Sequence, residues 1–260
     1  MSGVELSLSG KIALVTGASR KIGIGAAICR LFAEAGADIF FTYYTPYDQE
    51  MAWGIHPEEP GQLLAEIKAN NVRAAAVEAD LSDPATPRAL FDTAESLLGP
   101  VDILINNATY DVETDIYGLT GEALDRHYAV NVRGAVLLCQ EFARRHDGRP
   151  GGRIISMVSG ELFSPMKGNL PYVVTKGSID ALTLALSAEL APKGITVNAV
   201  DPGATDTGWI PGDLYAQLQQ DTALGRVGQP EDAARLILFL ASPLGGWITG
   251  QVIHSRGGLG

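Results

Sequence analysis

The sequence predicts a single α/β domain built on a seven-stranded, doubly wound parallel sheet with helices on both faces. Short apolar runs of strand length alternate with longer segments in which apolar residues recur every three or four positions, as in repeated strand-helix-strand units. Hydrophobic residue types make up 46% of the chain, enough for a large core. No linker rich in Ser, Gly or Pro divides residues 1–260, and no segment repeats at a fixed period, so we expect one domain.

The expected strands are apolar almost throughout, which indicates burial on both faces of a parallel sheet. They are 11–15, 38–43, 72–79, 101–105, 153–158, 196–200 and 251–254. The segments between them carry apolar residues with helical spacing and are expected to cover the sheet. These helices are 26–35, 61–69, 84–98, 122–145, 172–191 and 231–241.

Two connections are longer than ordinary loops and are candidate lids. Residues 44–60 form the first, and residues 202–228, which include a short helical pattern, form the second. We expect the segment of about 203–228 to cover the substrate, because its apolar side chains suit a partly apolar pocket. These side chains are Trp209, Ile210, Leu214, Tyr215 and Leu218.

The composition excludes several classes of function. The net charge of −11 argues against nucleic acid and anionic membranes as partners, because both are bound through clustered Lys and Arg. Residues 1–10 resemble no targeting segment, and no segment reaches the roughly 18 apolar residues of a membrane span, so we expect a soluble cytoplasmic protein. Cys29 and Cys139 lie among apolar neighbours, which suits buried thiols better than a disulfide. The four histidines show no metal-ligand spacing, so no metal is expected.

A glycine-rich turn joins the first expected strand to the first expected helix. Gly17, Gly23 and Gly25 allow the backbone to approach a ligand closely, since glycine has no Cβ. The helix that follows directs unpaired N–H groups and a partial positive charge at the same place, which favours phosphate binding. Such a turn alone is often only structural, but the strand before it and the helix after it favour a Rossmann-like dinucleotide site.

The residues near the end of the second expected strand favour NADP(H) over NAD(H). NAD sites usually place a carboxylate there to bind the ribose 2′-hydroxyl. Here Tyr43 ends the strand and no carboxylate follows before Asp48, whereas Arg20 and Lys21 in the glycine-rich turn could pair with a 2′-phosphate. The alternative is that both cations are solvated and Asp48 reaches the ribose of NAD. Asp80 could accept a hydrogen bond from the adenine amino group or could cap the next helix.

Tyr172 and Lys176 are four residues apart in a helical segment, so their side chains share one face. A nearby ammonium group stabilises a phenolate, which helps a phenol with an ordinary pKa of about 10 to exchange protons near neutral pH. Most pairs with this spacing are only surface neighbours, so a catalytic interpretation needs support from other residues.

Other residues provide that support, and with them the chain resembles the short-chain dehydrogenase/reductase family over essentially its whole length. Ser159 lies thirteen positions before Tyr172, and with Lys176 the three match the family's catalytic pattern. Asn131 matches the family's fourth catalytic residue. Asn106-Asn107-Ala108 resembles the family's Asn-Asn-Ala-Gly motif, and Pro202-Gly203 with Thr207 resembles the segment that cradles the nicotinamide.

The cofactor residues expected from the motifs and the resemblance come from every expected βα unit. They are Gly17, Ser19, Arg20, Lys21, Gly23, Ile24, Tyr43, Asp80, Leu81, Asn107, Ala108, Tyr172, Lys176, Pro202, Gly203, Thr205 and Thr207.

The resemblance implies a role for each catalytic residue. In the reductive direction Tyr172 donates a proton to the carbonyl oxygen as hydride from NADPH reaches the carbon, and Ser159 holds that oxygen. Lys176 lowers the pKa of Tyr172 and binds the nicotinamide ribose. Asn131 breaks its helix locally and holds a water that relays protons to Lys176; the alternative is a hydrogen-bonded core amide.

The chain departs from the family pattern at three places. The glycine-rich turn has two extra residues, Thr109 replaces the last glycine of Asn-Asn-Ala-Gly, and Asp201 stands where an asparagine usually precedes Pro-Gly. Lengthened first turns occur in the related enoyl reductases, but those space the tyrosine and lysine more widely. Carbonyl reduction therefore fits better.

Residues 225–232 and 248–251 resemble the 3-oxoacyl-carrier-protein reductase branch, which implies a small carbonyl or alcohol substrate, acyl thioesters included. An acidic carrier protein needs a basic dock. Four basic residues could form this dock or be ordinary solvated residues: Arg144, Arg145, Arg149 and Lys193.

The resemblance also implies a homotetramer, with helices 122–145 and 172–191 in one interface and the C-terminal strand in another. Two alternative functions stay open. One is an NAD-dependent alcohol or sugar dehydrogenase, and the other is a non-catalytic NADP-binding sensor or scaffold that keeps the fold.

Overall fold

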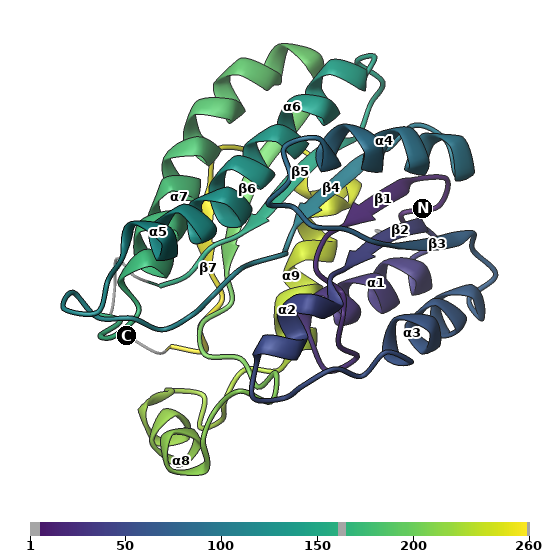
Figure 1. The fold of residues 1–260 in the computed structure, drawn as a ribbon. Coiled ribbons are helices and arrows are strands. Elements are labelled where there is room, and N and C mark those ends of the chain that lie inside the picture. Colours follow the sequence, from purple (N-terminus) through teal and green to yellow (C-terminus); the bar gives the residue numbers. More distant parts are fainter. Residues whose placement is uncertain (1–5, 161–164, 259–260) are drawn as a thin grey trace.

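Seven parallel strands form one sheet in the part of the chain that the computed structural model describes, residues 6–160 and 165–258 (Figure 1). They are β1 (Ile12–Val15), β2 (Asp38–Tyr43), β3 (Ala74–Glu78), β4 (Ile103–Asn106), β5 (Gly152–Met157), β6 (Ile195–Asp201) and β7 (Val252–His254). The order across the sheet is β3-β2-β1-β4-β5-β6-β7. This order confirms the predicted doubly wound parallel sheet, and each strand overlaps its predicted range.

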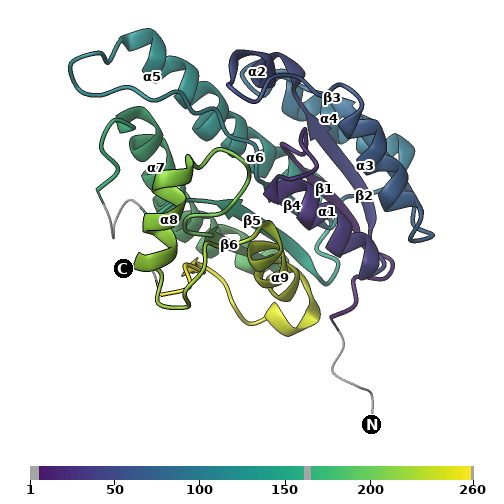
Figure 2. The ribbon, with the colours of Figure 1, turned by 90° about the horizontal axis from the view of Figure 1, so that it is seen from below.

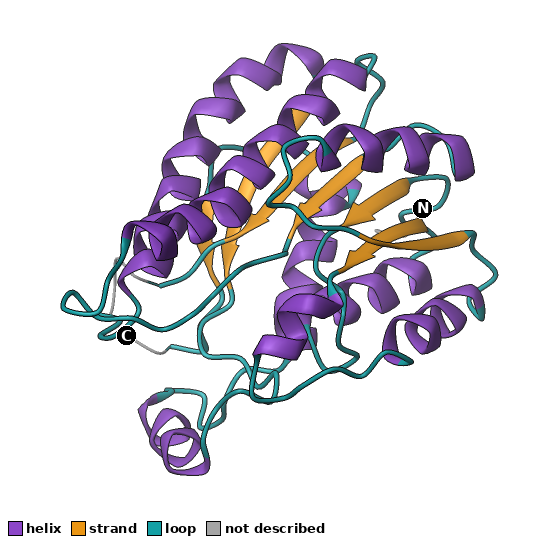
Figure 3. Ribbon diagram, in the orientation of Figure 1, coloured by secondary structure: helices purple, strands orange, loops and turns teal. Residues whose placement is uncertain are grey.

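Helices cover both faces of the sheet (Figure 3). One layer contains α1, α3 and α9, and the other contains α4, α6 and α7. The helices in the described residues are α1 (Ile24–Glu34), α2 (Thr45–Glu50), α3 (Glu59–Lys68), α4 (Thr86–Leu97), α5 (Gly121–His127), α6 (Ala135–Arg145), α7 (Leu170–Leu190), α8 (Gly212–Asp221) and α9 (Pro230–Ala241). None of them is long and apolar enough to cross a membrane.

Each face of the sheet has its own apolar core. Phe32 of α1 is buried in one core, and Phe91 of α4 and Phe142 of α6 are buried in the other. Cys29 and Cys139 lie in these two cores as free thiols, which confirms the prediction of buried cysteines. Burial raises the pKa of both thiols, that of Cys139 to about 12, so neither is a reactive thiolate near neutral pH.

The predicted helix 122–145 is interrupted around Asn131, where the local break was expected, because a π-helical turn (Tyr128–Gly134) separates α5 from α6. Two sequence-based predictions about the elements were wrong. The segment 44–60, predicted as a loop, begins with the short helix α2. The two edge strands, β3 and β7, are partly exposed, because an edge strand has a neighbour on one side only.

The strand order places a crevice at one edge of the sheet. The chain reverses its direction across the sheet between the neighbours β1 and β4, and ligands of such sheets bind beyond the carboxyl ends of the strands at this point. Figure 2 shows α8, which follows β6, on the side of α7 and away from α3. The two long connections that contain α2 and α8 therefore flank this edge.

Candidate functional site

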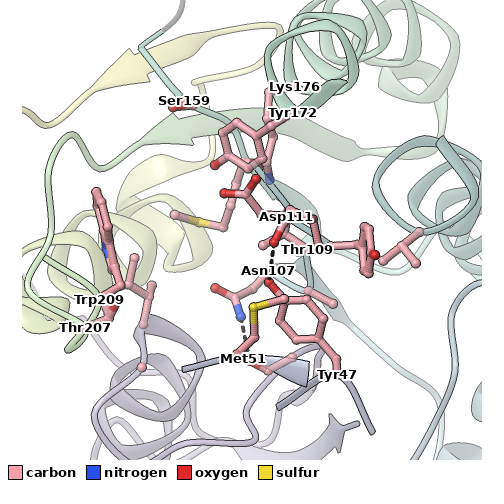
Figure 4. Close-up of a pocket in the computed structure, with 18 of the residues that line it drawn as sticks. Tyr47, Met51, Asn107, Thr109, Asp111, Ser159, Tyr172, Lys176, Thr207 and Trp209 are labelled. Atoms are coloured by element: carbon pink, nitrogen blue, oxygen red, sulfur yellow. Dashed lines mark hydrogen bonds between the residues drawn. The ribbon is translucent and has the colours of Figure 1, made fainter. Parts of the chain in front are cut away.

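A cleft of about 1840 Å³ opens at the carboxyl ends of the strands (Figure 4). Every residue that the sequence predicts for the site lines it except Lys21 and Asn131. From the predicted lid, Trp209, Leu214 and Leu218 line the cleft, whereas Ile210 and Tyr215 do not. The residues that do line it are Gly17, Ser19, Arg20, Gly23, Ile24, Tyr43, Asp80, Leu81, Asn107, Ala108, Ser159, Tyr172, Lys176, Pro202, Gly203, Thr205 and Thr207.

The glycine-rich turn packs directly against the end of β4. Gly17 has a φ of +75°, and a Cβ built there would lie 2.6 Å from the Cα of Ala108. A Cβ on Gly25 would lie 2.6 Å from the carbonyl oxygen of Gly17. The Nδ2 atom of Asn107 donates to the carbonyl oxygens of Thr16 and Gly17, both at 2.9 Å, and so fixes the turn. Two of the three glycines are therefore required by close backbone packing.

The first turn of α1 is open to an anionic ligand. Its N-cap, Gly23, offers no side-chain hydrogen bond, and the first turn contains no acidic residue. The unpaired N–H groups and the positive end of the helix dipole are thus left for a ligand at the glycine-rich turn, where Gly17 and Gly25 leave no side chain in the way. This arrangement fits the pyrophosphate of a dinucleotide.

We expect Gly17→Ala to weaken NADPH binding and to lower the stability of the protein by roughly 1 to 3 kcal/mol, because a Cβ there meets Ala108 at a positive φ. Gly23→Ala is the matched control, since Gly23 has a φ of −78° and its nearest contact would be 3.2 Å away. Thermal unfolding and NADPH titration measure both effects. Equal losses in the two variants would contradict this account of the turn.

The two basic residues of the turn take different directions. The Nζ atom of Lys21 lies 2.6 Å from Oε1 of Glu66 on α3, outside the cleft lining. The guanidinium carbon of Arg20 lies 4.1 Å from the ring centroid of Trp53, inside the cleft lining. Burial lowers the pKa of Arg20, and the negative charge of Asp48 opposes this shift. The structure therefore brings Arg20, but not Lys21, to the cleft.

Asp48, the alternative partner for a ribose, is already engaged. Its carboxylate is 6% exposed, and its Oδ1 atom accepts a hydrogen bond of 3.0 Å from the indole Nε1 of Trp53. Trp53 therefore contacts Asp48 through its N–H group and Arg20 through its ring. Both Trp53 and Asp48 come from the long connection after β2.

Asp80 lines the cleft but does not cap the next helix, since the N-cap of α4 is Ala85; its contact with an adenine stays a prediction. Its Oδ1 atom accepts from the backbone N–H of Ser82 at 2.8 Å, as a cap of the following turn does. Its Oδ2 atom accepts from the hydroxyl of Tyr44 at 3.1 Å, and the side chain lines the cleft. Ser19 is fixed nearby, because its Oγ atom accepts from the backbone N–H of Tyr44 at 3.1 Å.

Ser159, Tyr172 and Lys176 meet at the cleft from two elements, the end of β5 and the first half of α7 (Figure 4). Lys176 is 4% exposed, and its Nζ atom donates to the carbonyl oxygen of Met157 at 2.9 Å and lies 5.4 Å from the ring centroid of Tyr172. The Oγ atom of Ser159 lies 3.6 Å from the sulfur of Met166. A thioether is a weak acceptor, so a substrate oxygen can replace it.

Asn131 lies in the π-helical turn, which confirms the predicted local break of the helix. Its Oδ1 atom accepts from the backbone N–H of Tyr110 at 2.7 Å, and its Nδ2 atom donates to the carbonyl oxygen of Tyr110 at 2.9 Å and to Oγ1 of Thr175 at 3.1 Å. The side chain thus ties the segment after β4 to α7. These bonds match the alternative of a hydrogen-bonded core amide, and the water relay stays a prediction.

Several further cleft residues are not predicted by the sequence, among them Tyr47, Asp111, Asn169 and Arg256. Tyr47 lies on α2, and its hydroxyl donates to the carbonyl oxygen of Asp111 at 3.2 Å. Arg256 comes from the segment after β7 and pairs with Asp201 at 3.5 Å. Asp111 could have been predicted from its position four residues after Asn107, beyond the end of a central strand. The positions of the other three residues in the sequence give no such indication.

Comparisons with known proteins agree with the fold and the site. The family model described as Enoyl-(Acyl carrier protein) reductase matches residues 17–260. An uncharacterised oxidoreductase YjdA of Bacillus subtilis is 47% identical over 95% of this chain and 96% of its own length. The NADPH-dependent aldehyde reductase 2 of Arabidopsis thaliana chloroplasts is 36% identical over 99% of this chain and 97% of its own.

A solved structure of a short-chain dehydrogenase from Burkholderia cenocepacia, in complex with NADP, superposes with a TM-score of 0.87. It is 36% identical, and the match covers 97% of this chain and 98% of that one. The matches to these relatives cover almost the full length of the chain, and the family model spans residues 17–260, the range that contains the glycine-rich turn, Ser159, Tyr172 and Lys176. The chain therefore belongs to the short-chain dehydrogenase/reductase family of oxidoreductases.

Proposed function

We propose that the protein is an NADP(H)-dependent reductase of small carbonyl compounds, which oxidises the corresponding secondary or primary alcohols in reverse. One observation supports this most strongly: Tyr172, Lys176 and Ser159 line the same cleft as a glycine-rich turn built to approach a dinucleotide. A non-catalytic sensor would need the dinucleotide site but not the hydroxyl groups of Tyr172 and Ser159 beside it. Retention of all three side chains favours the enzyme.

The chain's own residues fit a nicotinamide dinucleotide. The turn at Gly17 and the first turn of α1 would hold the pyrophosphate, Asp80 the adenine, and Lys176 the nicotinamide ribose. Thr205 and Thr207 would flank the nicotinamide. When bound, the reduced nicotinamide supplies hydride to the carbonyl carbon.

The roles of the three residues follow from their positions. Tyr172 donates its phenolic proton to the carbonyl oxygen, and its side chain then carries the negative charge. The buried ammonium of Lys176, 5.4 Å from the ring centroid of Tyr172, stabilises that charge. Ser159 turns its hydroxyl from the Met166 sulfur to the substrate oxygen and holds it in place. Asn131 positions α7 relative to the segment after β4 through Thr175 and Tyr110.

NADP(H) is favoured over NAD(H) by the groups around β2. Arg20 is the turn's cation at the cleft, and Asp48 is held by Trp53. A 2′-phosphate would find a guanidinium there. The Burkholderia cenocepacia relative in complex with NADP and the NADPH-dependent relative from Arabidopsis thaliana support the same choice.

The basic residues that could dock an acidic carrier protein are engaged within the chain. Arg144 pairs with Glu141, Arg145 pairs with Asp92, Glu95 and Glu141, and Arg149 pairs with Asp102 and Asp147. Lys193 donates to a backbone carbonyl, and none of the four lines the cleft. Free carbonyl compounds are therefore favoured over carrier-bound acyl groups, although a 3-oxoacyl-[acyl-carrier-protein] reductase of Aquifex aeolicus is 34% identical. The segment 203–228 would act as the substrate lid through Trp209.

The test is a fluorescence titration with NADPH and NADH, followed by oxidation of each cofactor with a panel of β-ketoesters, quinones, aldehydes and ketones. Tighter NADPH binding with turnover is the expected result. Preference for NADH would favour the NAD-dependent alcohol or sugar dehydrogenase. Binding of NADPH without turnover of any carbonyl compound would favour the sensor.

We also infer a homotetramer in which α7 packs against a second copy. Leu184 and Val174 of α7 are 66% and 54% exposed, which is unusual for large apolar side chains on one helix. Light scattering is expected to give the mass of four chains, and Leu184→Lys is expected to lower it, because a buried unpaired charge is costly. A monomer in the unaltered protein would contradict the tetramer.

A further inference from the structure

The cleft contains a pair of polar side chains that the proposed reaction does not use. Asp111 lies five residues beyond the end of β4, and Asn169 is the N-cap of α7, three residues before Tyr172. The Nδ2 atom of Asn169 donates to Oδ2 of Asp111 at 3.2 Å. Figure 4 shows Asp111 among the cleft residues, on the side of Tyr172 and Lys176.

This hydrogen bond fixes which atoms of the pair remain available. Because the amide nitrogen of Asn169 faces a carboxylate, the amide oxygen must point elsewhere. That oxygen and the Oδ1 atom of Asp111 are both buried, and neither has a hydrogen-bond partner among the described residues. Asn169 as a whole is only 8% exposed. The pair therefore presents two buried acceptors and needs a donor that the described residues do not supply.

His127 does not supply that donor, although its Nε2 atom lies 4.0 Å from Oδ1 of Asp111. Its Nδ1 atom lies 2.7 Å from the carbonyl oxygen of Ala123 and must carry a proton to bond there. Its Nε2 atom accepts a hydrogen bond of 3.2 Å from the backbone N–H of Val112 and so carries none. With these two hydrogen bonds, the imidazole offers no N–H group to the Asp111 oxygen.

We propose that Asp111 and Asn169 form a substrate subsite that accepts a hydrogen bond from a hydroxyl group next to the reacting carbonyl. This inference rests on the proposed carbonyl reductase function and names its substrate class as hydroxy ketones and hydroxy aldehydes. The subsite lies at the start of the helix that carries Tyr172, so a hydroxyl on the neighbouring carbon is the group that reaches it. A keto acid is disfavoured, because its carboxylate would face two acceptor oxygens and would find no donor there.

The charges around the subsite favour a neutral donor over a cation or an anion. Burial raises the pKa of Asp111, and the hydrogen bond from Asn169 and the positive charge of Lys176 oppose this shift. The charge of Lys176 also repels a substrate ammonium group. Several cations line the same cleft and could attract an anionic substrate; of these, Arg256 pairs with Asp201 at 3.5 Å and Arg126 pairs with Glu50 at 3.3 Å.

The test compares three ketones that differ only in the group next to the carbonyl. They are 2-hydroxyacetophenone, propiophenone, in which a methyl group replaces the hydroxyl, and phenylglyoxylate, in which a carboxylate stands there. The aromatic ring suits a cleft lined by Tyr47, Tyr110 and Trp209. The kcat/KM of each is measured with NADPH as the reductant.

Asp111→Asn reverses the polarity of the subsite with little change of shape. Asn169 still requires an acceptor, so the new amide turns its oxygen to Asn169 and its NH2 group to the substrate. The ratio of kcat/KM for 2-hydroxyacetophenone to that for propiophenone is expected to fall roughly 10- to 100-fold, as for the loss of a hydrogen bond to a charged group. The kcat/KM for phenylglyoxylate is expected to rise, because the variant offers an NH2 group instead of a carboxylate to the substrate's carboxylate. The intrinsic reactivities of the ketones cancel when this ratio is compared between variants.

Two further variants separate the subsite from general effects. Glu113→Gln removes a charge from an exposed cleft residue two positions away and is expected to leave the ratio unchanged. Asn169→Ala removes the second acceptor and is expected to lower the ratio; the Asn169 side chain makes no capping bond to α7, so the helix start is kept.

The outcomes distinguish the subsite from the proposed function. An unchanged ratio in both Asp111→Asn and Asn169→Ala, with turnover retained, would overturn the subsite and leave the reductase function intact. So would an equal fall of the ratio in Glu113→Gln. Failure of the unaltered protein to reduce any of the three ketones or benzaldehyde would overturn the proposed function, and the subsite with it.

Discussion

Replacing Tyr172 by Phe is expected to reduce kcat for carbonyl reduction by roughly 100- to 10,000-fold while leaving the affinity for NADPH nearly unchanged. The substitution removes only the hydroxyl that donates the proton, and the ring stays in its place beside Lys176. In the proposed site, NADPH would make its main contacts elsewhere, at the glycine-rich turn and near Arg20. Single-turnover kinetics and fluorescence titration of NADPH measure the two quantities separately.

Tyr215→Phe provides the matched control for this experiment. Tyr215 lies on α8 and does not line the cleft, so loss of its hydroxyl is expected to leave kcat unchanged. Activity of Tyr172→Phe within a few fold of the unaltered protein would contradict the assignment of Tyr172 as the proton donor. A large loss of NADPH affinity would instead show that its hydroxyl serves chiefly to bind the cofactor.

The sheet was predictable because each strand has a recognisable pattern of apolar residues in the local sequence. Residues 38–43 are mostly apolar, with Ile39, Phe40 and Phe41 in succession, and the structure places β2 there with the same bounds. A parallel sheet covered on both faces requires such runs, so periodicity alone fixes the fold class. Tyr172 and Lys176 were predictable for a similar reason, since a spacing of four places them on one helix face.

The features that the sequence did not predict depend on contacts between distant segments. The break of helix 122–145 at Asn131 was expected, but its bonding partners Tyr110 and Thr175 were not, because they lie 21 and 44 residues away. Asp111 and Asn169 are 58 residues apart, and no local pattern signals that they meet. The direction of each side chain in a polar turn depends in the same way on partners that only the folded chain supplies.

Distant partners determine which of the two side chains, Arg20 or Lys21, lines the cleft. From the sequence alone, either cation could bind a 2′-phosphate. In the structure Lys21 is drawn to Glu66 of α3, while Arg20 stacks on Trp53 at the cleft. The choice between the two is made by residues more than thirty positions away in the sequence.

Arg20→Ala is therefore expected to weaken NADPH binding roughly 10- to 100-fold and to leave NADH binding within about twofold, because only NADPH carries the phosphate that a guanidinium pairs with. Lys21→Ala is the matched control. It removes the same charge from the neighbouring position but only breaks the pair with Glu66, so the ratio of the two affinities is expected to stay constant. Fluorescence titration of both cofactors with the unaltered protein and with each variant gives the ratio of the NADPH and NADH affinities for each protein.

The same titrations decide between the two interpretations of the segment after β2. Equal weakening of NADPH and NADH in Arg20→Ala would mean that Arg20 shapes the site without sensing the phosphate. Preference of the unaltered protein for NADH would mean that Asp48 leaves Trp53 to bind the ribose. That exchange would give up the 3.0 Å hydrogen bond of a carboxylate that is only 6% exposed, which is why the structure favours NADPH.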